Sequence, residues 1–182
     1  GGGSADAAAA LRTLIDLWRV AMPVDALFDL AATLGADVPM CLAGRQSIAT
    51  GIGEKLVPAP ALPACGLLLV NPGVALPTKE VFARRSARFS TAIAAELSWP
   101  TLADLVVALK RRGNDLTDAA VALQPVVGDV LAALEHAPDA HYAAMSGSGA
   151  TCFALFDDLA AANRAAETLP PDWWWHAGTF LN

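Results

Sequence analysis

The sequence has few of the residues that build disulfide frameworks or metal sites. Its three cysteines, Cys41, Cys65 and Cys152, lie far apart and form no CxxC pair. An odd number of widely spaced cysteines argues against a disulfide-stapled secreted domain and fits reduced thiols in the cytoplasm. The three histidines form no metal-ligand spacing with one another or with the cysteines. We therefore expect a cytoplasmic protein without a structural metal.

Positive charge is also scarce, since 12 Lys and Arg stand against 18 Asp and Glu, for a net charge of −6. A nucleic-acid surface needs clustered basic residues. The densest cluster here is Lys110-Arg111-Arg112, which we interpret as the solvated end of a helix. No apolar run reaches the ~20 residues that span a bilayer, and no basic leader is visible at the start. We expect a small-molecule partner rather than nucleic acid or a membrane, and the oligomeric state stays open.

The residues that are present favour a sizeable core, because 55% of the 182 residues are hydrophobic, enough for one or two compact domains. Apolar residues at helical spacing predict helices over 4–20, 25–34, 79–89, 102–111, 126–136 and 159–169, and one more that has Asn114 or Asp115 as its cap. Apolar runs between turn residues predict strands in QSIAT, CGLLLVNPG, HYAAMSGSGATCFALF (two strands and a turn) and WWWHAGTF. The Gly- and Pro-rich stretch GIGEKLVPAPALPA predicts a connection between two subdomains. This alternation is typical of an α+β or mixed α/β fold.

The first four residues, Gly1, Gly2, Gly3 and Ser4, lead directly into an alanine-rich helical pattern. Ser4 suits the N-cap position, and Asp6 suits the first helical turn. A glycine-rich turn before a helix N-terminus binds phosphate, because the unpaired N–H groups of the first turn point at the anion. A flexible Gly/Ser linker has the same composition. The pattern alone leaves both interpretations open.

Asp37 lies in LGADVPMCL, just beyond the helix predicted over 25–34. An aspartate in such a place commonly accepts hydrogen bonds from nearby backbone N–H groups and so forms a turn. The alternative is a catalytic role, because a carboxylate held between a helix end and a strand can orient and deprotonate a hydroxyl group.

Two further segments carry hydroxyl or aromatic groups in loops rich in glycine or proline. In NPGVALPTKEVF, Thr78 offers a hydroxyl and Phe82 an aromatic face, although a strand end with an irregular loop has the same pattern. In MSGSGATCFALF, the Gly-Ser-Gly stretch is either a hairpin turn or a loop whose backbone approaches a ligand closely. Ser146 and Ser148 would be hydroxyl donors in the second case.

In chain order, GGGSADAA, LGADVP, NPGVALPTKEVF, NDL and MSGSGATCFALF resemble the motifs of the GHMP kinase superfamily, from residue 1 to about residue 156. They look most like those of members that phosphorylate a cytidine diphosphate methylerythritol in the non-mevalonate synthesis of isoprenoid precursors. The resemblance implies an α+β fold of two lobes with the site between them. Residues 1–57 would be the remainder of the N-terminal ATP-binding lobe, and residues 58–182 the C-terminal α/β sandwich lobe.

The resemblance also implies roles for individual residues, with ATP and Mg²⁺ as cofactors. Along the ATP phosphates would lie Gly1, Gly2, Gly3 and Ser4. Asp37 would be the catalytic base that takes the proton from the 2-hydroxyl of the methylerythritol unit. Thr78 and Phe82 would bind the substrate, with the phenylalanine against the cytosine. A third loop near the phosphates and the substrate would consist of Ser146, Gly147, Ser148 and Gly149.

In family members, strands and a lysine that assists phosphoryl transfer precede this point of the phosphate loop. We therefore expect the sequence to begin inside that motif, the isolated chain to be inactive, and two helices of the first lobe to expose apolar faces. Two alternatives remain. One is another GHMP kinase, such as a homoserine kinase. The other is a non-catalytic α+β association domain whose Gly-Ser loops are only turns.

Overall fold

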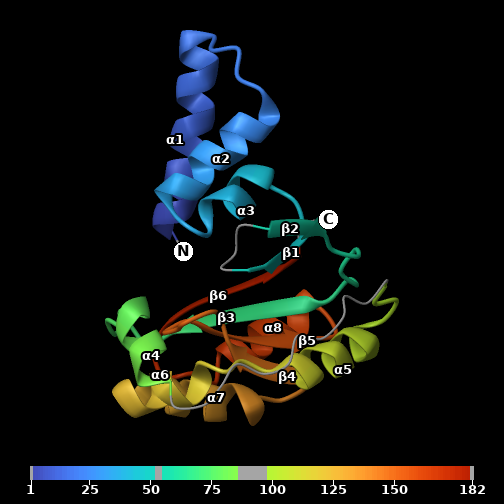
Figure 1. Cartoon of the computed structure of the whole chain (residues 1–182). Coiled ribbons are helices and arrows are strands. Elements are labelled where there is room, and N and C mark those ends of the chain that lie inside the picture. The colour runs from blue at the N-terminus through green and yellow to red at the C-terminus, as the bar shows by residue number, and fades with distance from the viewer. Residues whose placement is uncertain (1, 52–54, 86–97, 181–182) are drawn as a thin grey trace. The chain divides into compact units, whose positions relative to one another are not determined.

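The computed structural model describes residues 2–51, 55–85 and 98–180. The chain divides into two compact units, with the change from the first to the second at Ala61 and Leu62 (Figure 1). The division that the resemblance implied after residue 57 falls inside a short strand, β2, which ends at Pro58. Each unit is described by itself below.

Unit 1 is a small helical assembly with one hairpin. Its elements are α1 (Gly2–Trp18), α2 (Val24–Leu34), α3 (Val38–Ala43), β1 (Ser47–Thr50) and β2 (Lys55–Pro58). The two strands pair antiparallel, and α3 packs against both longer helices. The buried core of this unit consists of small and medium side chains: Ala8, Ala31, Val38 and Leu42. The guanidinium of Arg12 donates a hydrogen bond to the carbonyl of Leu42 and so links α1 to the end of α3.

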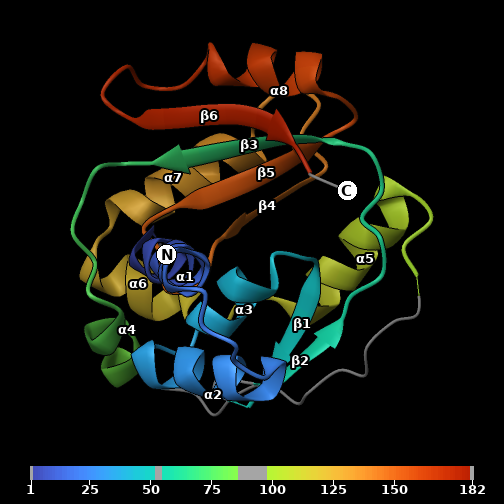
Figure 2. The same ribbon diagram turned by 90° about the horizontal axis from the view of Figure 1, so that it is seen from above.

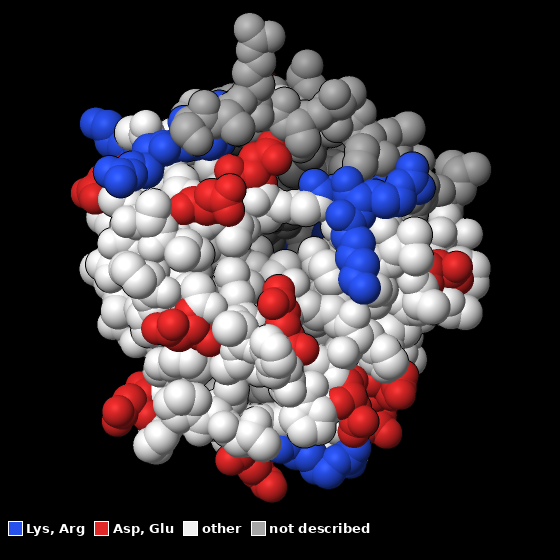
Figure 3. Space-filling view, turned by 90° about the horizontal axis from the view of Figure 1, so that it is seen from below, with Lys and Arg blue, Asp and Glu red and all other residues white. Residues whose placement is uncertain are grey.

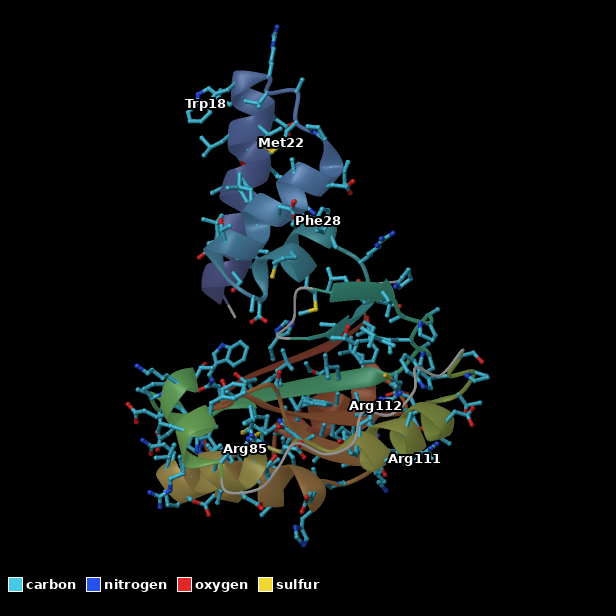
Figure 4. All side chains as sticks on the ribbon, viewed as in Figure 1. Trp18, Met22, Phe28, Arg85, Arg111 and Arg112 are labelled. Atoms are coloured by element: carbon cyan, nitrogen blue, oxygen red, sulfur yellow. The ribbon has the colours of Figure 1, made fainter. Side chains whose placement is uncertain are left out.

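The outer surface of unit 1 carries large apolar side chains, as the sequence predicted. Leu17 and Trp18 at the end of α1 are 69% and 67% exposed (Figure 4). The helix α2 adds Val24 and Leu34, which are also more than half exposed. Phe28, by contrast, packs against the core of the unit. Exposed large apolar side chains on neighbouring helices favour association.

Unit 2 contains the larger core. Its elements are β3 (Gly66–Asn71), α4 (Thr78–Arg84), α5 (Leu102–Arg112), α6 (Thr117–Leu123), α7 (Val126–Glu135), β4 (Tyr142–Met145), β5 (Cys152–Phe156), α8 (Leu159–Ala166) and β6 (Trp174–Thr179). The four strands form one sheet in the order β4-β5-β3-β6, and every pairing is antiparallel. An antiparallel sheet with separate helices is the α+β arrangement that the sequence predicted (Figure 2).

Both faces of this sheet are covered by apolar side chains. On one face, Leu68 of β3 and Phe156 of β5 belong to the main core, against which α7 and α8 pack (Figure 1). On the other face, Leu155 of β5 forms a second cluster with Leu105 of α5. Burial on both faces explains why β3 and β5 are continuous apolar runs rather than alternating sequences.

Two elements of unit 1 were not predicted. The helix α3 forms in VPMCLA although it contains Pro39, because a proline in the first helical turn removes no intrahelical hydrogen bond. The strand β2 forms within the stretch interpreted as a connection, and Pro58 lies at its end, opposite Ser47. A terminal proline leaves the remaining ladder intact.

Several predicted helix boundaries also differ, among them the end of α8, at Ala166 rather than residue 169. The helix α1 begins at Gly2, so Ser4 lies in its first turn rather than at the N-cap, and Asp6 lies beyond that turn. The alanines that follow are strong helix formers and favour this extension. The helix α6 begins at Thr117 with Leu116 as its N-cap rather than Asn114 or Asp115, because the side chain of Asn114 forms a turn before the helix. The helix expected over 79–89 ends at Arg84, and residues 86–89 lie outside the described residues.

None of the described helices has both the length and the apolar character needed to cross a membrane. On the face of the molecule in Figure 3, Lys and Arg side chains form separate groups among Asp and Glu rather than one basic patch. Arg111 and Arg112 lie at the end of α5, where positive charge suits the helix dipole (Figure 4).

We predict that Cys152 makes the protein less stable at high pH. Its side chain is fully buried in the main core, and burial raises the pKa of this thiol from 9.0 to about 12. Above pH 9 the unfolded chain releases a proton that the folded protein keeps, so the free energy of unfolding falls as pH rises toward 12. The loss is about 1.4 kcal/mol at pH 10. Urea unfolding at pH 8 and pH 10 measures it.

The control for this prediction is Cys152→Ala, which removes the thiol and should show a correspondingly smaller loss between the two pH values. Cys65 and Tyr142, whose pKa values burial also raises, contribute equally to both proteins. An identical pH dependence in the variant and the parent would contradict the prediction.

Candidate functional site

The predicted phosphate-binding residues of unit 1 lie at the N-terminus of α1. Gly2 and Gly3 are exposed, with open space where a Cβ would be, and Ser4 is half-buried. The first turn of a helix has N–H groups without intrahelical partners, which can donate to an anion. Gly1 lies outside the described residues.

Asp37 lies at the N-terminus of α3. Its main chain is fixed on the side of α3, because its carbonyl accepts the N–H of Cys41 at 3.1 Å and the next two residues, Val38 and Pro39, are buried. The side chain is exposed and makes no capping hydrogen bond to α3. The sequence predicted a position between a helix and a strand. The structure instead places Asp37 between α2 and α3, because the segment after it is helical.

In unit 2, the structure brings two of the predicted segments together. The hydroxyl of Thr78, at the start of α4, lies 2.8 Å from the hydroxyl of Ser148 in the Gly-Ser loop. The two residues are 70 positions apart in the sequence. The contact joins the segment NPGVALPTKEVF to the segment MSGSGATCFALF.

The loop between β4 and β5 is a tight turn held by its own backbone. The N–H of Ser146 donates to the carbonyl of Thr151 at 2.9 Å, and the N–H of Gly149 donates to the carbonyl of Ser146 at 3.0 Å. Gly149 has a φ of +88°, and a Cβ there would meet the Met145 sulfur at 2.8 Å. In the described part of the chain, the N–H groups of Gly147 and Ser148 have no hydrogen-bond partner.

A pocket of about 510 Å³ opens beside this loop, a size within the range of small-ligand sites. Phe82 of α4 lines it with a ring that is 48% exposed. The other main contributions come from the end of α5, from the segment that follows it and from the sheet: Leu109, Arg112, Asn114, Asp115, Tyr142, Met145, Ser146, Gly147 and Phe153. The pocket therefore combines aromatic walls with polar groups.

Asn114, which lines the pocket, and Asn71, which does not, were given no role from the sequence. The amide of Asn114 donates to the carbonyls of Met145 and Gly147, at 3.0 and 2.8 Å. The amide of Asn71 donates to the hydroxyl of Thr151 at 2.9 Å. Both lie in motifs that carried the resemblance, NDL and NPG, but these partners are distant in sequence. No local pattern identifies them.

Two family models match the chain. The N-terminal domain of GHMP kinases matches residues 1–45, and the GHMP kinase C-terminal domain matches residues 92–174. Among curated proteins, the chain is 49% identical over 180 residues to the 4-diphosphocytidyl-2-C-methyl-D-erythritol kinase of Gluconacetobacter diazotrophicus. This match covers 98% of the chain and 59% of that relative. The chain therefore spans about three fifths of the length of the relative.

Among solved structures, a 4-(cytidine 5'-diphospho)-2C-methyl-D-erythritol kinase matches with a TM-score of 0.75 and 33% sequence identity. The match covers 98% of the chain and 65% of that structure. The homoserine kinase of Cytophaga hutchinsonii matches with a TM-score of 0.65 at 20% identity, over 97% of the chain and 63% of that structure. At this identity the second likeness concerns the fold alone.

Proposed function

Because this chain belongs to the GHMP kinase family, we propose that the full-length protein transfers the γ-phosphoryl group of ATP to the 2-hydroxyl of 4-diphosphocytidyl-2-C-methyl-D-erythritol. The observation that carries the proposal is the 2.8 Å contact between Thr78 and Ser148, which joins two of the motif segments beside one pocket. The 49% identity to a kinase of that name supports the choice of substrate. Residues 1–57 would serve ATP binding, and residues 58–182 would form the C-terminal lobe.

Asp37 is the catalytic base in this proposal. It takes the proton of the substrate hydroxyl as the oxygen forms a bond to the γ-phosphorus, while the bond from that phosphorus to the leaving oxygen of ADP breaks. The exposed N–H groups and hydroxyl at the start of α1, from Gly2 to Ser4, donate to the phosphates of ATP, and we assign Gly1 to the same role. Little covalent chemistry is left to the protein, so positioning and charge neutralisation dominate the rate.

Magnesium enters the proposal with ATP. The described residues contain no group of three or more His, Cys, Asp and Glu that would cage a metal ion. This fits Mg²⁺, which is usually held by substrate phosphates, water and one or two protein oxygens. Ser4, with its hydroxyl on the first turn of α1, is the residue we assign to the ion or to a neighbouring phosphate oxygen. When bound, the ion neutralises phosphate charge.

The cytidine end of the substrate is assigned to the pocket of unit 2. The exposed ring of Phe82 suits stacking on a planar base. Thr78 offers a hydroxyl one helical turn earlier, at the start of α4. The turn from Ser146 to Gly149 supplies N–H and hydroxyl donors for oxygen atoms of the ligand. We also propose that the protein works in the cytoplasm, which its free cysteines support.

The direct test uses the full-length protein with MgATP and follows ADP release. Phosphorylation of the cytidylyl substrate, with homoserine inert, is the expected result. Phosphorylation of homoserine alone would favour the other kinase. If no ADP is released with any alcohol substrate, the assigned reaction is contradicted and an association role is favoured.

We predict that Phe82→Ala raises the KM for the cytidylyl substrate and leaves the KM for ATP unchanged. An aromatic contact of this kind contributes ~0.5–1.5 kcal/mol beyond its buried area, so the KM should rise by a factor of about 2 to 13. Steady-state kinetics with each substrate varied in turn gives both constants. Phe82→Tyr keeps the ring and serves as the control. A KM that rises for ATP alone would show that the stacking assignment is wrong.

A further inference from the structure

Asn114 makes three hydrogen bonds in two directions. Its side-chain oxygen accepts the N–H of Leu116 at 3.0 Å, which fixes the turn before α6. Its amide nitrogen donates to the carbonyls of Met145 and Gly147, at the end of β4 and in the loop after it. Because a carbonyl can only accept and a backbone N–H can only donate, these partners fix the orientation of the amide. One half-buried side chain thus joins the start of α6 to the loop after β4.

The two carbonyls lie on either side of Ser146, within the segment we assign to the substrate. Gly147 has a φ of +55°, in the left-handed region, and the N–H groups of Gly147 and Ser148 meet no acceptor in the described part of the chain. A loop with open donors serves a ligand only if its conformation is fixed beforehand. The loop's own turn bonds join Ser146 to Gly149 and Thr151. The bonds from Asn114 hold the two carbonyls that these turn bonds do not use.

We propose that Asn114 is a positioning residue of the kinase reaction: through its two amide hydrogen bonds it holds the loop from Ser146 to Gly149 in its ligand-binding shape. The proposal rests on the proposed function, since it assigns this loop to the substrate. It assigns no contact between Asn114 and the reacting atoms. The NH₂ group of Asn114 binds the loop that we assign to the ligand. The side-chain oxygen of the same residue binds the turn before α6 and so serves the fold.

The substitution Asn114→Asp removes the hydrogen bonds to the loop and keeps the hydrogen bond to the turn before α6. The carboxylate still accepts the N–H of Leu116, but it has no proton to donate and repels both carbonyls. Asn71 provides a matched control, because its oxygen likewise accepts a backbone N–H, that of Gly73, at 2.8 Å. Its amide donates to the hydroxyl of Thr151, and a hydroxyl can reverse and donate instead. Asn71→Asp should therefore keep its contact.

Steady-state kinetics of the full-length protein gives the first measurement. Asn114→Asp should lower kcat/KM for the cytidylyl substrate by about tenfold or more, the effect of two lost hydrogen bonds. Asn71→Asp should stay within about twofold of the parent. Val130→Ala, a core change in α7 that removes no hydrogen bond to the loop, controls for lost stability at a temperature where all proteins are folded. Equal losses in Asn114→Asp and either control would overturn the proposal.

The pH profile gives the second measurement. A protonated carboxyl group can donate to one of the carbonyls, so the activity of Asn114→Asp relative to the parent should recover as pH falls from 8 toward 5.5. A purely structural loss from the lower stability of the variant would not recover in this way. A ratio that stays constant with pH would count against the proposal.

Amide hydrogen exchange separates a failure of this proposal from a failure of the proposed function, because it needs no substrate. Peptides that cover residues 142–151 should exchange faster in Asn114→Asp than in Asn71→Asp. If the parent phosphorylates no alcohol substrate, the proposed function fails, and Asn114 then has no role in catalysis. If the parent is active but the two variants exchange alike, the role of Asn114 is overturned.

Discussion

Replacing Asp37 with asparagine in the full-length protein should lower kcat by about 10²–10⁴-fold, the contribution of a general base. The amide has the shape of the carboxylate but cannot accept the hydroxyl proton. ATP binding should be unchanged, because the phosphates are assigned to the N-terminus of α1. The fold should also be unchanged, since asparagine has the size and shape of aspartate and the residue is exposed.

The kinetic measurement is single-turnover phosphorylation together with the ATP dissociation constant. Asp29→Asn is the matched control, an exposed acid on the neighbouring helix α2 with no assigned role. It should stay within about twofold of the parent. If Asp37→Asn also retains half or more of the parent rate, Asp37 is not the base.

Replacing Gly66 with alanine should destabilise unit 2 by about 3 kcal/mol or more, at the upper end of overpacking effects. A Cβ at this position would lie 2.0 Å from the carbonyl oxygen of Asp158 and 2.5 Å from its carbonyl carbon. Backbone atoms cannot move aside as a flexible side chain can. Gly66 is also paired on both sides, with Phe156 of β5 and Thr179 of β6, so a shift of β3 disturbs two ladders.

The other partner in this contact is equally fixed. Asp158 caps α8: its carboxylate accepts the N–H of Ala161 at 2.8 Å, and its carbonyl accepts the N–H of Ala162 at 3.2 Å. Urea unfolding of Gly66→Ala gives the loss of stability. Gly128→Ala in α7 is the control, because the nearest atom there belongs to the side chain of Val121, at 3.2 Å, rather than to the backbone. Alanine favours helix, so the control should change the stability far less than Gly66→Ala. A loss below about 1 kcal/mol in Gly66→Ala would contradict the close contact.

The sequence alone predicted those elements whose signal lies within a few neighbouring residues. The strand β3, the helix α5 and the two strands around the Gly-Ser turn all match their predicted positions. Apolar spacing decides such elements, because it determines which face of a segment can be buried. Prediction failed for α3 and β2, where prolines obscured the pattern although their positions allow a helix and a strand.

The sequence likewise identified the motif segments and the family, but not the chemistry that connects them. The tertiary structure alone brings Thr78 to Ser148 and places Asn114 against the carbonyls of Met145 and Gly147. The need for glycine at Gly66 is equally invisible in the sequence, since Asp158 is distant along the chain. Local spacing fixes which residues become helix or strand, whereas contacts between distant residues depend on strand order and on the packing of helices against the sheet. These contacts determine which of the motif residues of unit 2 lie together beside its pocket.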